Sequence, residues 1–266
     1  MKKKATVLGV FDSGLGGLTV LKEIIKNKYY SKIIYLGDTG RVPYGTRSRE
    51  TIIKYARQDI RFLLAKGANE IIIACGTVSS IAIDVLKNEF DVLITGMIEF
   101  TAKEAVIKTN NNIIGVIGTQ ATINNNAYER QIKKMNEKIK LINVACPLFV
   151  PLVEYGFLKE KQIIESVCDF YLSTVKFSEA DTLIMGCTHY PILKEYFKNY
   201  FDHINLIDMG ESVLKNLNMQ RKYDEDLNVA FYVTDAVDSF IQGASLFFGD
   251  ITLENVTLVK NLNKYN

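Results

Sequence analysis

The sequence has few of the side chains from which enzyme sites are usually built. Its 266 residues contain no tryptophan, two histidines, four cysteines and four prolines. The cysteines are Cys75, Cys146, Cys168 and Cys187, and the histidines are His189 and His203. Because no two cysteines form a CxxC pair, the pattern favours neither a zinc knuckle nor a secreted disulfide framework. We expect reduced thiols in a cytoplasmic protein.

An excess of charge of one sign is also lacking. The 32 basic and 30 acidic residues leave a formal charge of +2, so we expect neither nucleic acid nor a membrane as a partner. No apolar run approaches the roughly 18 residues that a membrane span requires. With 48% hydrophobic and 23% charged residues, the chain is typical of a globular protein of one large or two small domains.

Short apolar runs recur along the chain, most of them followed by a polar or glycine-rich turn and a segment of helical period. Continuous apolar runs predict strands that are buried on both faces, and the helices between them predict parallel crossovers. The predicted class is α/β with mainly parallel sheets. The runs are residues 5–11, 32–36, 70–74, 92–95, 112–117, 141–145, 182–185, 204–207 and 229–233.

Two segments resemble two later segments in the same order. Residues 71–77 (IIIACGT) resemble 183–189 (LIMGCTH), and residues 8–13 resemble 114–119. The repetition predicts two similar doubly wound domains with a cleft between them. Cys75 and Cys187 would then lie at equivalent strand ends, which is where open α/β sheets bind ligands.

The surroundings of these two cysteines suggest chemistry. Each follows a predicted strand and precedes a predicted helix start, and a helix N-terminus lowers a thiol pKa by stabilising the thiolate. Each thiol could therefore act as a base or a nucleophile. Cys146 and Cys168 are interpreted as structural. His189 next to Cys187 could instead bind zinc in a hydrolase, but the sequence offers no third ligand beside them.

Two turns also leave predicted strand ends. The first, residues 12–17 (DSGLGG), could hold a small anion on backbone N–H groups, and it fits neither a dinucleotide fingerprint nor a P-loop. Asp12 in this turn is either a helix cap or a group that relays a proton or binds an ammonium. The second turn, residues 37–45 (GDTGRVPYG), has proline and glycine that define its conformation.

Together these motifs resemble the glutamate racemase family of cofactor-independent enzymes. The resemblance covers nearly the whole chain and rests on residues 11–17, 37–45, 74–77 and 186–191, with further similarity at 148–154 and 231–234. It implies one α/β domain of residues 1–97 with 210–266 and a second of residues 98–209. It also implies a cytoplasmic homodimer that interconverts L- and D-glutamate without cofactor or metal and supplies D-glutamate for peptidoglycan.

The family's chemistry assigns roles to particular residues. Inverting an α-carbon requires proton removal on one face and proton delivery on the other, so two bases must flank the substrate. The resemblance implies that Cys75 deprotonates D-glutamate with help from Asp12, and that Cys187 deprotonates L-glutamate with help from Glu154 and His189. The substrate contacts that it implies are Asp12, Ser13, Pro43, Tyr44, Gly45, Gly76, Thr77, Thr119, Thr188 and His189.

Gly76 is a departure from the family pattern beside one of the two cysteines. Gly76 stands where these enzymes usually have asparagine, so a side-chain amide worth about 1–3 kcal/mol is missing if nothing replaces it. Glycine is also expected to loosen the turn beside Cys75. We expect racemisation that is retained but reduced. The alternatives are a racemase of aspartate or another small acid, and a binding protein without catalysis.

Overall fold

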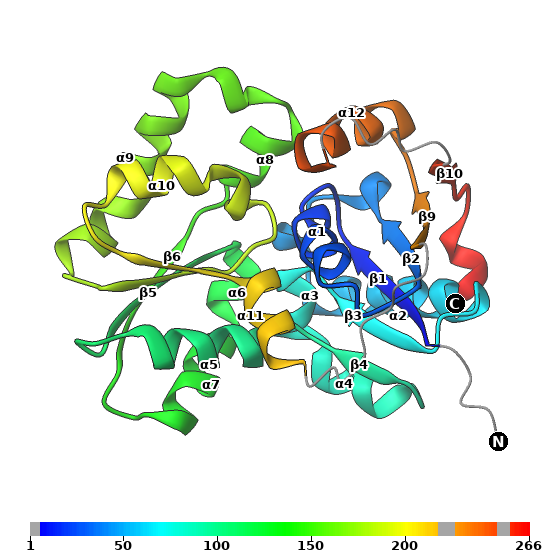
Figure 1. Ribbon diagram of the computed structural model, residues 1–266, viewed down its shortest axis with the longest axis horizontal. Helices are drawn as coiled ribbons and strands as arrows, with labels where there is room; N and C mark the ends of the chain where they lie inside the picture. Colours follow the sequence, from blue (N-terminus) through cyan, green and yellow to red (C-terminus); the bar gives the residue numbers. More distant parts are fainter. Residues whose placement is uncertain (1–5, 218–226, 249–255) are drawn as a thin grey trace.

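Two parallel sheets, each covered by helices on both faces, make up the structure (Figure 1). The computed structural model describes residues 6–217, 227–248 and 256–266. All strand pairs in these residues are parallel, which confirms the predicted α/β class. Residue 5 of the first predicted strand, and residues 1–5, 218–226 and 249–255 of the predicted first domain, lie outside the described residues.

The larger sheet has six strands in the order β10-β9-β2-β1-β3-β4. Five of them match apolar runs predicted from the sequence, and the three-residue β10 was not predicted. Two residues of β10 are exposed, so it lacks the continuous apolar run of a buried strand. The strands are β1 (Val7–Asp12), β2 (Lys32–Gly37), β3 (Glu70–Ile73), β4 (Leu93–Thr95), β9 (Asn228–Val233) and β10 (Val256–Leu258).

The smaller sheet repeats part of this order. It runs β6-β5-β7-β8, which corresponds strand for strand to β2-β1-β3-β4. The strands are β5 (Ile113–Gly118), β6 (Lys140–Ala145), β7 (Thr182–Met185) and β8 (Asn205–Asp208), all at predicted runs. The internal sequence similarity therefore reflects a repeated topology, in which β3 before Cys75 is equivalent to β7 before Cys187.

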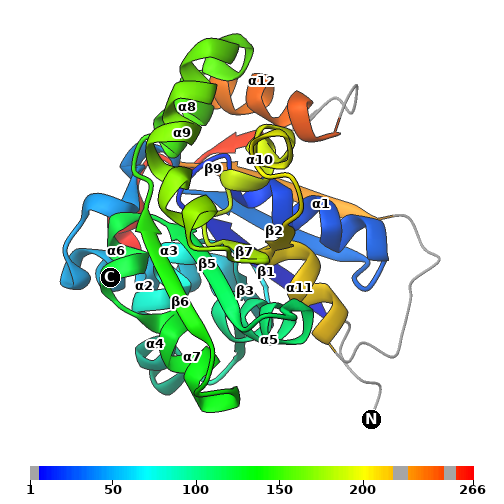
Figure 2. The same ribbon diagram turned by 90° about the vertical axis from the view of Figure 1, so that its left-hand side faces the viewer.

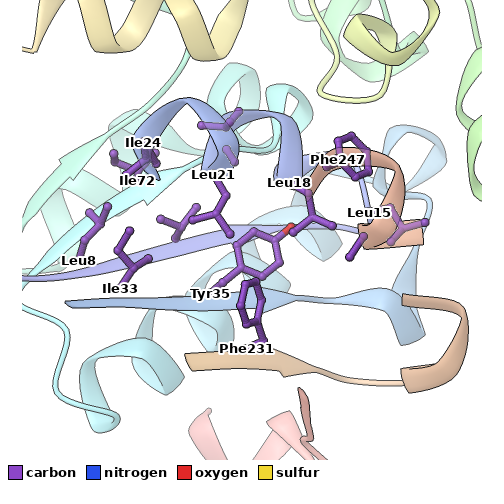
Figure 3. Packing of buried hydrophobic residues seen from close by; sticks show 14 of the residues in the cluster. Leu8, Leu15, Leu18, Leu21, Ile24, Ile33, Tyr35, Ile72, Phe231 and Phe247 are labelled. Carbon is purple, nitrogen blue, oxygen red and sulfur yellow. The ribbon is translucent and has the colours of Figure 1, made fainter. Parts of the chain in front are cut away.

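Helices cover both faces of the larger sheet because each presents an apolar stripe to it. On one face lie α1 (Gly17–Asn27), α11 (Met209–Asn216) and α12 (Val237–Phe248). The apolar stripe of α1 is buried there at Leu18, Leu21 and Ile24, packed against Leu8, Ile72 and other residues of the sheet (Figure 3). On the other face lie α2 (Arg49–Ala65), α3 (Gly76–Ile81), α4 (Ile83–Glu89) and the short helix η5 (Leu262–Tyr265).

The smaller sheet is covered in the same way, as Figure 2 shows. One face carries α8 (Phe149–Glu154), α9 (Lys161–Phe177) and α10 (Lys194–Tyr200), and the other carries α5 (Ile98–Lys108) and α7 (Ala127–Met135). Short helices complete the loops: η1 (Thr39–Arg41), η2 (Tyr44–Thr46), α6 (Gln120–Asn124), η3 (Phe157–Lys159) and η4 (Tyr190–Leu193). Among the described residues, none of the helices combines the length and apolar character needed to cross a membrane.

The expected division into residues 1–97 with 210–266 and residues 98–209 stays a prediction. The late strands β9 and β10 pair within the larger sheet, so both ends of the chain contribute to it. Because β1 and β5 are interior strands with neighbours on both sides, the turns after β1, β3, β5 and β7 lie at strand ends suited to ligand binding. These turns carry the sequence motifs and bring them together.

Candidate active site

Asp12, the last residue of β1, anchors the glycine-rich turn. Its side chain is fully buried, and its Oδ2 accepts a hydrogen bond of 3.0 Å from the backbone N–H of Gly14. Its Oδ1 accepts one of 3.2 Å from the hydroxyl of Thr188 on the smaller sheet. Burial raises the pKa of Asp12, although nearby His189 and backbone N–H groups oppose the rise. Asp12 therefore joins the ends of β1 and β7.

Cys75 lies between β3 and α3, and its thiol is buried. Its Sγ lies 3.6 Å from the hydroxyl of Ser13. The expectation of a lowered thiol pKa is wrong for Cys75: burial and then the charge of Asp12 raise its pKa to about 12. The N–H of Val78 in α3 acts in the predicted direction but is outweighed. In this environment Cys75 is a thiol, ready to give a proton.

Cys187 follows β7 and belongs to a chain of three side chains. Its Sγ lies 3.6 Å from Nδ1 of His189, and Nε2 of His189 lies 2.5 Å from Oε1 of Glu154. The same Glu154 oxygen accepts a hydrogen bond of 3.0 Å from the backbone N–H of Leu15. The helix predicted directly after Cys187 is the 3-10 helix η4, with α10 following it. Glu154, at the end of α8, thus orients His189 towards the sulfur.

The pKa values of His189 and Glu154 favour an ion pair between these two side chains. Burial lowers the pKa of His189, but hydrogen bonds with Cys187 and Glu154 outweigh burial and raise it well above its usual value. Burial likewise raises the pKa of Glu154, but the hydrogen bond and charge of His189 outweigh it and lower the pKa. The His189 imidazolium thus lies beside the sulfur of Cys187, whereas the carboxylate of Asp12 acts on Cys75. The two cysteines therefore have opposite surroundings.

We predict that Glu154→Gln weakens folding in one pH window. The lowered pKa of Glu154 stabilises the fold above 4.5, and this contribution is lost as pH falls through the lowered value. The raised pKa of His189 stabilises it fully below 6.5, and this contribution is lost as pH rises through the raised value. Between these two pH values the variant should lose about 1–3 kcal/mol of unfolding free energy.

Chemical unfolding over a pH series measures this deficit. It should shrink at alkaline pH, where His189 is neutral in the parent. The control is Glu195→Gln, which removes an exposed carboxylate from a surface ion pair and should have little effect. A deficit of Glu154→Gln that is equally large at strongly alkaline pH contradicts the ion pair.

Threonine hydroxyls link the two sheets beside the cysteines. Oγ1 of Thr77, in α3, lies 2.9 Å from Oγ1 of Thr119, which caps α6 after β5. Gly45 packs on Thr119 so closely that an added Cβ would lie 2.6 Å from the Thr119 Cβ, so the loop needs glycine there. Thr188 contacts Asp12, as described above. These residues and Ser13 supply hydroxyls around the two thiols.

Two of the predicted substrate contacts, Tyr44 and Pro43, differ from the other predicted contacts in what surrounds their side chains. The phenol hydroxyl of Tyr44 is bonded to the buried carboxylates Asp38 and Asp59, so its backbone is the part left for a substrate. Pro43 is exposed and lines a cavity of about 290 Å³. Glu154 and Leu15 also line this cavity, which therefore borders the Glu154 side chain.

Gly76 is packed tightly, which corrects the expectation of a loosened turn. It is buried as the first residue of α3, and an added Cβ would lie 2.5 Å from the carbonyl oxygen of Gly186 and 3.4 Å from Sδ of Met209. Gly186 directly precedes Cys187. The missing side chain therefore allows the two cysteine-bearing turns to approach each other.

The remaining cysteines and His203 lie away from these groups. Cys146 and Cys168 are buried in the core of the smaller sheet, and His203 is exposed before β8. Both ring nitrogens of His189 are engaged, one with Cys187 and one with Glu154. Within the part of the chain that the structure describes, no three His, Cys, Asp or Glu side chains are grouped to hold a metal.

The sequence interpretation missed the buried cluster around Tyr44. Asp59 lies on the apolar stripe of α2 that includes Ile52, Ala56 and Leu63, spaced as i, i+4, i+7 and i+11. A carboxylate on such a stripe signals a buried polar contact.

The fold is that of a racemase family. A family model described as Asp/Glu/Hydantoin racemase matches residues 30–216, and the chain belongs to that family. Within it, the chain is similar to glutamate racemases. It is 41% identical over 250 residues to the glutamate racemase of Aquifex aeolicus, covering 94% of this chain and 97% of that protein.

Two further comparisons agree. The glutamate racemase of Persephonella marina is 43% identical over 258 residues, covering 95% of this chain and 98% of that protein. The crystal structure of glutamate racemase from Francisella tularensis in complex with D-glutamate matches with a TM-score of 0.86 at 37% identity, covering 98% of this chain and 99% of that chain.

Proposed function

We propose that this chain interconverts L- and D-glutamate, with Cys75 and Cys187 as the two proton-transferring groups. The observation that carries the proposal is the placement of two buried thiols after equivalent strands, each with its own partners. Cys75 lies beside Ser13 and near Asp12, whereas Cys187 lies beside His189 and Glu154. The similarity to glutamate racemases, one of them solved with D-glutamate, supports glutamate as the substrate.

The proton states suit the L-to-D direction. The Cys187 thiolate, favoured by the His189 imidazolium, takes the α-proton of L-glutamate and leaves its electron pair on the substrate. The Cys75 thiol then delivers its proton to the opposite face. The hydroxyls of Ser13 and Thr77 can donate hydrogen bonds to substrate oxygens as negative charge develops, and these bonds are strong because the site is buried. The reverse reaction exchanges the roles of the two thiols.

Exchange in deuterated water tests the proposal. Purified protein should incorporate deuterium at the α-carbon of both D- and L-glutamate, detected by NMR, while circular dichroism follows loss of optical activity. A panel of enantiopure acids that includes aspartate measures substrate preference. Faster turnover of aspartate would replace glutamate as the substrate, and ligand binding without exchange of any acid would indicate a binding protein.

We place this reaction in the cytoplasm, where all four free cysteines would stay reduced. The resemblance to the family implies that its D-glutamate enters peptidoglycan. No metal or cofactor is part of the proposed chemistry, since the two thiols and their neighbours account for both proton transfers.

We further propose a homodimer, paired through α9. Three large apolar side chains, Ile163, Phe170 and Phe177, recur every seven residues along this helix and are 46%, 74% and 85% exposed. An antiparallel pairing about a two-fold axis at Phe170 places Ile163 of one copy opposite Phe177 of the other. Each copy then presents the same apolar surface to the other, as a two-fold interface requires.

Phe170→Glu is therefore expected to convert the dimer into monomers, because it places two like charges together at the axis. Sedimentation equilibrium measures the mass. Ile107→Glu is the matched control, since Ile107 is 64% exposed on a different helix, α5, and this variant should remain dimeric. A parent protein that is monomeric at micromolar concentration, or a dimeric Phe170→Glu variant, overturns the pairing.

A further inference from the structure

Two carboxylates lie buried under the loop that carries Pro43, Tyr44 and Gly45. Asp38, just after β2, and Asp59, in the middle of α2, are both fully buried. Arg41 and Tyr44, from the two short helices of the loop, lie between them. This cluster lies outside the set of residues that transfer protons, yet it is continuous with a loop that borders the site.

The contacts within the cluster are close. Nε of Arg41 donates to Oδ2 of Asp38 over 2.5 Å, and Nη2 donates to Oδ1 of Asp59 over 2.9 Å. The Tyr44 hydroxyl bonds with Oδ2 of Asp38 and also lies 3.1 Å from Oδ2 of Asp59. Arg41 is the only cation with an ion pair to these two carboxylates among the described residues.

Counting hydrogens shows what these contacts require. A phenol carries one hydrogen, which can be donated to only one carboxylate at a time. If Tyr44 donates to Asp38, the hydrogen in its contact with Asp59 must come from Asp59. Counting charge gives the same answer, because two ionised carboxylates would leave one negative charge uncompensated in a buried site. One shared proton makes the cluster neutral.

We propose that Asp59 is protonated at neutral pH, and that the chain from Asp59 through Tyr44 to Asp38 positions the substrate loop. In this arrangement Asp59 donates to the Tyr44 oxygen, and Tyr44 donates to an ionised Asp38. Asp38 and Asp59 are positioning residues, and neither touches the substrate. This proposal rests on the proposed function, because positioning of the loop affects activity only if the loop binds the substrate.

The surroundings of Asp59 support this assignment. Burial, then the negative charge of Asp38, raise its pKa well above the usual value, against the opposing effects of Arg41 and Tyr44. Asp12, at the end of β1, adds to the rise. Within the described part of the chain, these four groups are the charged and titratable side chains that act on Asp59.

Further contacts connect this cluster to the loop residues that lie beside the two thiols. Oδ1 of Asp38 accepts a hydrogen bond of 2.8 Å from Thr234, whose hydroxyl accepts one of 2.8 Å from the N–H of Gly40. These contacts hold the start of the loop, and Gly45 at its far end packs against Thr119 of the smaller sheet. The backbone of Tyr44 and Gly45 is thus held in place beside the hydroxyls around the thiols.

Two substitutions that each replace one oxygen by an NH₂ group distinguish this proposal from the alternative that the cluster serves only to pack the core. In Asp59→Asn, the amide N–H₂ donates to Tyr44 and the amide oxygen accepts from Arg41, so the variant reproduces the protonated acid. It should keep kcat and KM for glutamate within about twofold. Asp38→Asn removes the anion opposite Arg41, and KM should rise about tenfold with a smaller change in kcat.

The hydroxyl of Tyr44 has its own test. Tyr44→Phe should raise KM like Asp38→Asn. Tyr55→Phe should leave both constants unchanged, because Tyr55 packs its ring on Tyr44 and the hydrogen bonds that the described residues make in the cluster do not involve its hydroxyl. Equal losses in Asp59→Asn and Asp38→Asn, or an unchanged Tyr44→Phe, overturn the proposal.

A direct readout does not depend on racemisation. Asp59 has a raised pKa in the fold, so its contribution to stability declines as pH rises from the ordinary value near 3.8 through the raised value. Asp59→Asn should therefore match the parent in acid and be more stable at neutral pH. The infrared difference spectrum of parent minus Asp59→Asn should show a protonated carboxyl stretch at neutral pH. Only a carboxylate stretch there overturns the proposal, even in a protein that racemises glutamate.

Discussion

Serine in place of Cys187 or of Cys75 is expected to reduce racemisation of glutamate about a thousandfold. The reaction needs a base on one face of the α-carbon and an acid on the other, and an alcohol is far too weak an acid to take over the role of a thiol. Neither variant removes the partners of the other cysteine. Each should therefore still act on the face that keeps its sulfur.

The two variants should differ in how they exchange deuterium. Cys75→Ser retains Cys187 with His189 and Glu154, so it should exchange the α-proton of L-glutamate slowly without inversion. Cys187→Ser should show the same behaviour with D-glutamate. NMR detects the exchange, and circular dichroism measures inversion in the same samples.

Cys168→Ser is the matched control. It makes the same atomic change in a buried cysteine on α9, in the core of the smaller sheet, and should keep full activity per folded molecule. Full racemisation by either Cys75→Ser or Cys187→Ser would rule out the two-base scheme. Loss of activity in all three variants would instead indicate damage to the fold.

The sequence was most informative where structure depends on local pattern. Continuous apolar runs predicted nine of the strands, because strands such as β1, β5 and β7 are buried on both faces and need apolar residues at every position. Strand β10 escaped because it is short and largely exposed. The repeated context of Cys75 and Cys187 predicted their equivalence, which the matching strand orders of the two sheets now explain.

Contacts between segments far apart in the sequence could not be predicted from such local patterns. The hydrogen bond of Glu154 to the N–H of Leu15 joins residues 139 positions apart, and it depends on how the two sheets dock. The raised thiol pKa of Cys75 could not be predicted from the sequence for a related reason. A helix N-terminus is visible in sequence, whereas the burial that outweighs it arises only when both sheets close over the sulfur.

The buried cluster around Asp59 could be predicted only in part from the sequence. Its position on the apolar stripe of α2 signals a buried polar group, but its partner Asp38 follows a different element and Arg41 a third. The sequence pattern alone does not reveal that two carboxylates share one arginine. That pairing emerges only from the folded loop.

Gly76→Asn is expected to lower kcat/KM for glutamate about ten- to a hundredfold. From sequence alone, restoring the family's asparagine would be expected to supply a missing substrate contact and raise activity. The structure reverses that prediction. A Cβ at this position would lie 2.5 Å from the carbonyl oxygen of Gly186, which is backbone and directly precedes Cys187. To admit the side chain, the turn that carries one sulfur must move away from the turn that carries the other.

Gly76→Ala separates the effect of bulk from that of the amide. Alanine adds the same Cβ without any hydrogen-bonding group, so it should lose as much activity as asparagine if the contact with Gly186 governs the distance between the two cysteine turns. Steady-state kinetics in both directions measures the loss, and the melting temperature of each variant tests whether the fold survives. An asparagine variant more active than the parent would show that the turns can separate freely and that the parent lacks only an amide. An alanine variant with parental activity would likewise show that the close approach of Gly76 to Gly186 is not needed for proton transfer between the two faces of the substrate.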